Sequence, residues 1–316
     1  MTISQRILCA AVVGLVAQNL AHASSLLVSY SSTNGGGIEK FSLTPQSTGT
    51  LFASDNAAIN TLTTANNTAY WATSTQISSD SLNDATGGSG KTALPSIPFG
   101  GVTITDLAVD PATNDYYVGW NAPGFGWFIA QYPPSGSNFA VFANATTLVQ
   151  GLTIANNTAY WIEGQNIYSQ DLGTTTRHLL QSFTLGPVTL NDVAIDTAGQ
   201  TYLLAASENG LPPLIARYPL TPNASGVLFT FGTNPITALT VAGDRAYWID
   251  GSNVWSENLN GTDLTLQETL PASFTLTDLA VSIDPPAAAP EPSGLVMLAG
   301  GLICIIFRGR HHSNPR

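Results

Sequence analysis

The chain has 316 residues, of which 9 are Lys or Arg and 20 are Asp or Glu, so its formal net charge at pH 7 is −11. All 20 acidic residues but only five basic ones lie between residues 24 and 292, which gives this stretch a net charge of −15. Such a field excludes nucleic acid and anionic lipid surfaces as favoured partners. The two cysteines, Cys9 and Cys304, lie near the ends, so the stretch between them has no disulfide, thiol nucleophile or thiolate metal ligand.

Residues 1–23 have the pattern of a secretory signal peptide. Arg6 precedes a short apolar stretch from Ile7 to Leu20, and Ala21-His22-Ala23 fits an A-x-A cleavage site. We therefore expect the mature chain to start near Ser24. A retained N-terminal membrane helix is the alternative, which the short apolar stretch and the well-formed cleavage site disfavour.

Two sequence units alternate along the middle of the chain. One reads Leu-Thr-x-Ala-x-x-x-Ala-Tyr-Trp, at residues 62–71, 152–161 and 239–248, and the other contains Asp-Leu-Ala or Asp-Val-Ala, at residues 106–108, 192–194 and 278–280. Their first core residues are 45, 45, 41, 46 and 40 residues apart: Leu62, Leu107, Leu152, Val193, Leu239 and Leu279. This spacing is typical of a four-stranded propeller blade.

The two ends of the repeat region complete each other. The sixth unit ends near Asp284 after one strand, whereas residues 26–52 supply three strand-like segments without an inner strand. A propeller blade shared by both termini would use all of them and leave no inner edge unpaired. We therefore predict an all-β, six-bladed β-propeller over residues 24–285, closed by its termini, with alternating blade types and hence pseudo-threefold symmetry.

The Tyr-Trp pairs resemble those of the YWTD propellers of receptor ectodomains, and the aspartate-containing units resemble NHL and SMP-30-type blades. The Thr-Asp that follows Tyr-Trp in the YWTD pattern is replaced by Ala72-Thr73, Ile162-Glu163 and Ile249-Asp250, so the resemblance implies only the aromatic pair and the ring geometry. We expect the repeated tryptophans to pack between neighbouring blades rather than to bind a ligand: Trp71, Trp161 and Trp248.

The last 27 residues carry a separate pattern. Pro290, Glu291 and Pro292 precede a 15-residue apolar run, 293–307, and a basic end that contains Arg308 and Arg310. As a helix the run would rise about 22 Å, short of a hydrocarbon core of about 30 Å. The motif, the run and the basic end together resemble the PEP-CTERM sorting signal. This resemblance implies recognition by an exosortase, a membrane transpeptidase-like enzyme of bacteria that make exopolysaccharide, and removal of the tail near the PEP motif.

The two ends together predict an exported bacterial protein. Residues 286–292 form a linker with the PEP motif, and residues 293–316 form a membrane helix with a basic tail, which the positive-inside rule places in the cytoplasm. We expect the helix to anchor the chain in the inner membrane before processing. Afterwards the protein would lie at the cell surface or in the extracellular matrix.

The main candidate site is a trio of aspartates just before the inner strands: Asp106, Asp192 and Asp278. In a propeller they would gather at one mouth of the central channel. They would either hold a cation such as calcium, which prefers oxygen ligands, or accept backbone N–H bonds from the adjacent blade and lock the ring. The equivalent positions in the other blades are uncharged, which favours the structural role: Thr61, Gly151 and Ala238.

A second candidate is a group of aromatic residues around Asn-Ala-Pro-Gly: Trp120, Phe125, Trp127 and Phe128. An apolar excursion of this kind fits contact with a sugar ring or a partner protein, and it fits equally well the covering of a blade edge.

No catalytic residue is assigned. His178 is the only histidine between the terminal segments, and it falls on a predicted outer strand, away from the channel. Two functional classes remain: a non-catalytic propeller that binds a glycan, peptide or partner protein, and an extracellular metal-dependent hydrolase or lactonase that uses the aspartate trio. We predict the first, with no cofactor assigned.

Overall fold

The computed structural model describes residues 24–83, 90–94, 101–135, 138–183, 186, 188–208 and 210–283, which belong to one unit, Ser24–Ile283. The expected signal peptide, PEP motif and C-terminal helix lie outside the described residues. Within those residues we find no helix that is long and apolar enough to cross a membrane.

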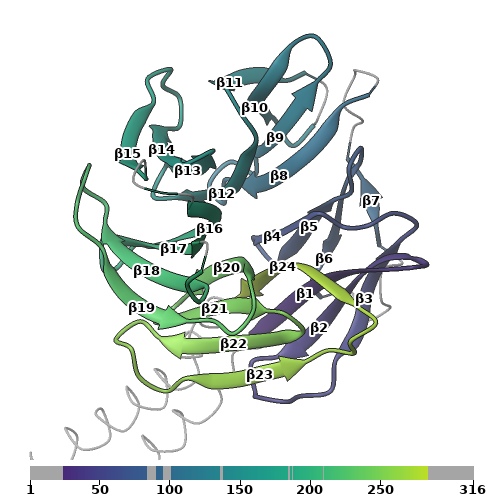
Figure 1. Cartoon of the computed structure of the whole chain (residues 1–316). Coiled ribbons are helices and arrows are strands. Elements are labelled where there is room, and N and C mark those ends of the chain that lie inside the picture. Colours follow the sequence, from purple (N-terminus) through teal and green to yellow (C-terminus); the bar gives the residue numbers. More distant parts are fainter. Residues whose placement is uncertain are drawn as a thin grey trace, which may run out of the picture. The chain divides into compact units, whose positions relative to one another are not determined.

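The described residues form six four-stranded antiparallel sheets, which are the blades of a propeller (Figure 1). Blade 1 contains β24 (Thr275–Ser282), β1 (Ser25–Ser32), β2 (Gly35–Ser42) and β3 (Thr50–Asp55). Blade 2 contains β4 (Thr61–Ala65), β5 (Thr68–Ala72), β6 (Ile77–Ser81) and β7 (Thr92–Ala93). Blade 3 contains β8 (Thr103–Val109), β9 (Tyr116–Ala122), β10 (Gly126–Tyr132) and β11 (Ala140–Ala145).

Blade 4 contains β12 (Val149–Ala155), β13 (Thr158–Glu163), β14 (Asn166–Asp171) and β15 (His178–Ser182). Blade 5 contains β16 (Val188–Asp196), β17 (Thr201–Glu208), β18 (Leu214–Pro219) and β19 (Val227–Phe231). Blade 6 contains β20 (Ile236–Ala242), β21 (Arg245–Asp250), β22 (Asn253–Asn258) and β23 (Thr265–Thr269). The all-β, six-bladed propeller predicted from the repeats is therefore confirmed.

The ring closes as the sequence predicts. The inner strands β24, β4, β8, β12, β16 and β20 contact one another in turn, so they surround a central channel. In blade 1 the inner strand comes from the C-terminal side, because β24 pairs with β1 from Ser25↔Ser282 to Ser31↔Thr275. No blade among the described residues is left without its inner strand.

The hydrophobic core lies between the blades. Each of six core clusters joins two adjacent blades, so the cores continue around the ring. The repeated tryptophans contribute to three of them and are buried, as predicted from their repetition: Trp71, Trp161 and Trp248. All described strands and clusters lie within residues 24–283, so this unit has a complete core of its own and is expected to fold alone.

Truncation of one of these tryptophans is expected to be costly. Trp161 is fully buried and joins blade 4 to Ile129 and Phe142 of blade 3. We expect Trp161→Ala to lower the free energy of unfolding by about 3–5 kcal/mol, because it leaves a large cavity. Trp161→Phe should cost much less, since the indole N–H has no protein partner among the described residues and its loss leaves no polar group unpaired. Urea unfolding of the two variants would check this, and equal losses would contradict it.

Tight turns join the inner and second strands of blades 2 and 4. Asn66 and Asn67, and likewise Asn156 and Asn157, have positive φ angles between 47° and 62°. Two successive residues in this region form the hairpin turn that asparagine tolerates best after glycine. The Asn-Asn pairs therefore form these turns through their own backbone preference.

The middle hairpins of the blades alternate in length. The second strands have 8, 7 and 8 residues in blades 1, 3 and 5, but 5, 6 and 6 residues in blades 2, 4 and 6. The register pairs Asn121 with Thr103 and Glu208 with Val188, so the tips of the longer hairpins lie where the inner strands begin. We call this end of the ring the hairpin face.

Candidate functional site: the central channel

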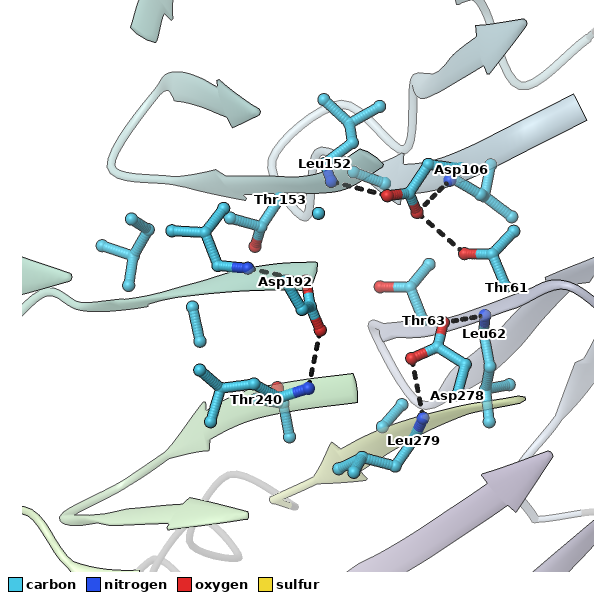
Figure 2. Close-up of a pocket in the computed structure, with 18 of the residues that line it drawn as sticks. Thr61, Leu62, Thr63, Asp106, Leu152, Thr153, Asp192, Thr240, Asp278 and Leu279 are labelled. Atoms are coloured by element: carbon cyan, nitrogen blue, oxygen red, sulfur yellow. Dashed lines mark hydrogen bonds between the residues drawn. The ribbon is translucent and has the colours of Figure 1, made fainter. Parts of the chain in front are cut away.

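The inner strands of all six blades line a channel cavity of about 510 Å³. Figure 2 shows the aspartate trio on its wall, with threonines from the intervening blades between them. The structure therefore brings Asp106, Asp192 and Asp278 together on one cavity, each half-buried and lining it.

A β-bulge positions each of these aspartates. The register of the inner strand shifts between Ile104 and Asp106 in β8 and between Leu190 and Asp192 in β16, and a similar shift occurs in β24 just before Asp278. A bulge adds one unpaired residue, which bends the strand and changes the direction of the next side chain. The bulge residues are the polar ones that precede the aspartates: Thr105, Asn191 and Thr277.

Each carboxylate bridges its own blade to the next one. The Asp106 Oδ1 atom accepts the Leu107 N–H at 2.7 Å, and Oδ2 accepts the Leu152 N–H of blade 4 at 2.7 Å. Asp106 also accepts a hydrogen bond from the Thr61 hydroxyl of blade 2 at 2.9 Å. A charged acceptor makes each bond stronger than one between neutral groups.

The other two aspartates repeat this arrangement. Asp192 accepts the Val193 N–H of its own strand at 2.7 Å and the Leu239 N–H of blade 6 at 2.6 Å. In the same way Asp278 accepts the N–H groups of Leu279 and, across the blade junction, Leu62 of blade 2, at 2.7 and 2.6 Å (Figure 2). The trio thus ties blade 1 to 2, blade 3 to 4 and blade 5 to 6.

Burial raises the pKa of all three carboxyl groups. The pKa of Asp106 is raised to about 6 and that of Asp278 to about 8, and the pKa of Asp192 lies well above its usual value of 3.8. Loss of hydration is the main cause, and neighbouring carboxylates of the trio add to it at Asp192 and Asp278. The backbone N–H donors act in the opposite direction but do not outweigh burial. Asp278 therefore stays protonated to a higher pH than an exposed aspartate would.

Apart from the trio and Asp196, the side chains that line the cavity are uncharged. Several threonines line it, and three of them occupy matching positions in the intervening blades, just after the leucines that donate to the trio: Thr63, Thr153 and Thr240 (Figure 2). The lining residues include no His, Lys, Ser or Cys. The described wall therefore contains no Ser–His or Cys–His pair of nucleophile and base.

The carboxyl oxygens of the trio are already engaged by hydrogen bonds within the protein. Within the described part of the chain, no group of three His, Cys, Asp or Glu side chains is placed to hold a metal ion. Both oxygens of each carboxylate already accept a backbone N–H group. These contacts support the ring-locking role that the sequence left open beside calcium binding.

The aromatic candidates divide into two pairs. Trp120 is fully buried and stacks edge-on against Phe128, which is also buried, with ring centroids 4.3 Å apart. Both lie in the core between blades 2 and 3, which for these two residues supports the alternative of covering a blade edge. Pairing between β9 and β10 continues through Trp120 and Phe128, so these residues belong to the strands rather than to a loop, and their rings face the core. Phe125 at the hairpin tip is 75% exposed, and Trp127 is half-buried.

Two buried carboxylates tie loops to the ring in a way that the sequence analysis did not foresee. The Glu163 Oε1 atom accepts a hydrogen bond from the Thr146 N–H at 2.7 Å, and its Oε2 atom forms an ion pair with the Arg177 guanidinium at 2.9 Å. Asp250 accepts the N–H groups of Thr233 and Asn234 at 2.8 and 2.7 Å. Both lie two residues after a repeated Tyr-Trp pair. The sequence signal for this role was an acidic residue two positions after the tryptophan, which the sequence comparison treated only as a departure from the Thr-Asp of the YWTD pattern.

His178 lies on β15, the outer strand of blade 4, and its side chain is exposed. Asp110 and Asp196 at the ends of inner strands accept backbone N–H groups from Ala112 and Gly199 within their own turns, as expected of turn-forming residues. None of these side chains joins the channel trio in a catalytic arrangement.

No protein-family model and no curated protein sequence matches the chain. Solved structures do resemble it. A chain of a nidogen–laminin complex has a TM-score of 0.66 at 17% identity, with 82% of this chain and 98% of that one covered. TolB from Acinetobacter baumannii has a TM-score of 0.64 at 12% sequence identity, with 82% of this chain and 66% of that chain covered. A putative TolB from Agrobacterium tumefaciens has a TM-score of 0.59 at 12% sequence identity, with 84% of this chain and 99% of that chain covered. At these identities the likeness shows the propeller fold alone.

Proposed function

We propose that this chain is an exported bacterial protein of the cell surface or extracellular matrix, whose propeller is a non-catalytic binding module. The signal-peptide pattern of residues 1–23 supports export. The PEP-CTERM resemblance of residues 290–316 supports processing by an exosortase and a transient anchor in the inner membrane.

The observation that carries the binding role is the contrast between the channel and the hairpin face. The channel carboxylates already bond to backbone N–H groups across the blade junctions, so they contribute to the ring itself. The Phe125 ring is 75% exposed at the tip of a long hairpin, between Gly124 and Gly126, whose φ angles are 84° and 87°. An aromatic ring presented in this way stacks well on the apolar face of a sugar.

A glycan is therefore the first ligand to test. We expect the purified propeller unit to be retained on an array of neutral glycans, and Phe125→Ser to weaken binding at least tenfold, as loss of a central aromatic contact does. Val141→Ser is the matched control, because Val141 is also exposed and apolar but lies on the outer strand of the same blade. Equal binding by the two variants, or no retention of the unaltered propeller on any glycan, would contradict the proposal.

A further inference from the structure

The outer strand of blade 5, β19, has an unusually apolar exposed surface. Val227, Leu228 and Phe231 are 64%, 52% and 57% exposed. Each of the outer strands β3, β11 and β15 has a single large hydrophobic residue that is comparably exposed: Leu51, Val141 and Leu179. Natural sheets usually protect an outer strand with charged residues or proline, and β19 has neither.

The absence of charge extends well beyond the strand. From Tyr218 to Gly243 the sequence contains 26 residues and no Asp, Glu, Lys or Arg, although residues 24–292 carry a net charge of −15. The nearest cation, Arg217, turns its guanidinium toward the Leu259 carbonyl of blade 6 and packs over the Phe229 ring. The strand therefore carries no charged side chain of its own in a strongly negative domain, and the charged groups that meet it are Arg217 and the buried Glu257 carboxyl group, which hydrogen-bonds to Thr230.

A bulge determines which side chains face outward. The register shifts between Ile215 and Ala216, so Phe229 has no direct partner on β18. Its ring turns inward and meets Trp248 of blade 6, with centroids 6.5 Å apart. Val227, Leu228 and Phe231 remain outside. Since the bulge interrupts the regular ladder of the edge, side-chain packing rather than extension of the sheet would make a contact here.

We propose that this edge, Val227 to Phe231, is the contact surface of a homodimer. Residues 24–283 contain 18 acidic and five basic residues, so two copies of the propeller unit, each with a net charge of −13, repel one another. A strand without charged side chains lets them approach without bringing carboxylates together. A two-fold axis near Phe229 would place Val227 of one copy beside Phe231 of the other, which makes the patch self-complementary. Leu211, 55% exposed on the loop before β18, would extend it.

The size of the patch sets the expected strength. Three side chains and one loop residue form a contact below the roughly 1,200 Å² of total buried surface at which specific interfaces are usually stable. We therefore expect a weak, reversible dimer with a dissociation constant between about 1 μM and 1 mM. Salt should strengthen it, because salt screens the repulsion between the two acidic domains.

Sedimentation equilibrium of the propeller unit, residues 24–283, tests this proposal over the same concentration range and at two ionic strengths. We expect the unaltered unit to dimerise, and Leu228→Glu to weaken the dimer at least tenfold. Val141→Glu adds the same charge to the equivalent outer strand of blade 3 and should leave dimerisation unchanged. Thermal unfolding would verify that both variants are folded.

Two results would overturn the proposal. One is a monomer at every concentration and both ionic strengths, which would leave the edge to an apolar partner of another kind. The other is equal weakening by Leu228→Glu and Val141→Glu, which would assign the effect to net charge. The proposal does not depend on the glycan-binding role of the hairpin face, and Phe125→Ser should leave the dimer intact.

Discussion

Replacing Asp192 with alanine is expected to lower the free energy of unfolding of the propeller by about 2–5 kcal/mol. The substitution leaves the N–H groups of Val193 and Leu239 without their acceptor at a blade junction, and each unsatisfied buried donor costs about 1–3 kcal/mol. Urea unfolding of the propeller unit would measure the loss. Thr153→Ala, which alters another half-buried position on the channel wall, should change stability by less than about 0.5 kcal/mol.

Two comparisons separate the ring-locking role from ion binding. Asp192→Asn keeps one oxygen acceptor and should lose about half as much stability as Asp192→Ala. Because a ligand of the native state must raise its melting temperature, calcium should leave the melting temperature unchanged if the trio only locks the ring. A calcium-dependent rise in Tm that disappears in Asp192→Ala would instead establish an ion in the channel and revive the metal-dependent hydrolase.

The propeller is expected to become less stable as the pH rises from about 4 to about 8. The native pKa values of the trio lie above the value near 3.9 that aspartate has in an unfolded chain, with about 6 at Asp106 and about 8 at Asp278. Between these limits the native state binds more protons than the unfolded state, so the free energy of unfolding falls with increasing pH. The contribution of the trio is complete below about pH 4 and is lost as the pH passes through the native pKa values.

Thermal unfolding across this pH range would measure the effect. A variant in which Asn replaces all three aspartates removes the titrating groups, so its Tm should depend less on pH than that of the unaltered propeller. The remaining slope would report the general repulsion among the other acidic residues, which acts in the same direction. An identical slope in both proteins would show that the trio titrates at ordinary values and that burial does not control its protonation.

The blades could be predicted from the sequence because their signals repeat. Buried aromatic residues at nearly regular spacing, such as Trp161 and Trp248, indicate one packing environment used several times. Asn156-Asn157 marks a turn by its backbone preference alone. Ring closure could be predicted as well. One strand before Asp284 and three strands after Ser24 make a complete four-stranded blade only if the two ends of the chain share it.

The site was less predictable, for physical reasons. The partners of Asp106 and Asp278 are backbone N–H groups, which every non-proline residue has, so no sequence motif identifies the blade junction that they bridge. The aromatic segment shows the same limit. Trp120 and Phe128 have the composition of a binding loop, but pairing between β9 and β10 continues through them and places both rings in the core.

The closure of blade 1 has a consequence for the order in which the chain can fold. Blades 2 to 6 are each built from consecutive strands and can form as soon as their own segment is available. Strand β1 instead pairs with β24, about 250 residues later, and the Ser29 and Thr277 hydroxyls hydrogen-bond to each other across this pair. Strand β1 therefore cannot complete its pairing until β24 is available. Contacts between such distant segments form slowly because a long loop must close first. Until the last strand pairs, β1 has an exposed edge, and the cores that blade 1 shares with its two neighbours are incomplete. A chain that crosses a membrane starting from its N-terminus would therefore complete its ring only at the end of transit.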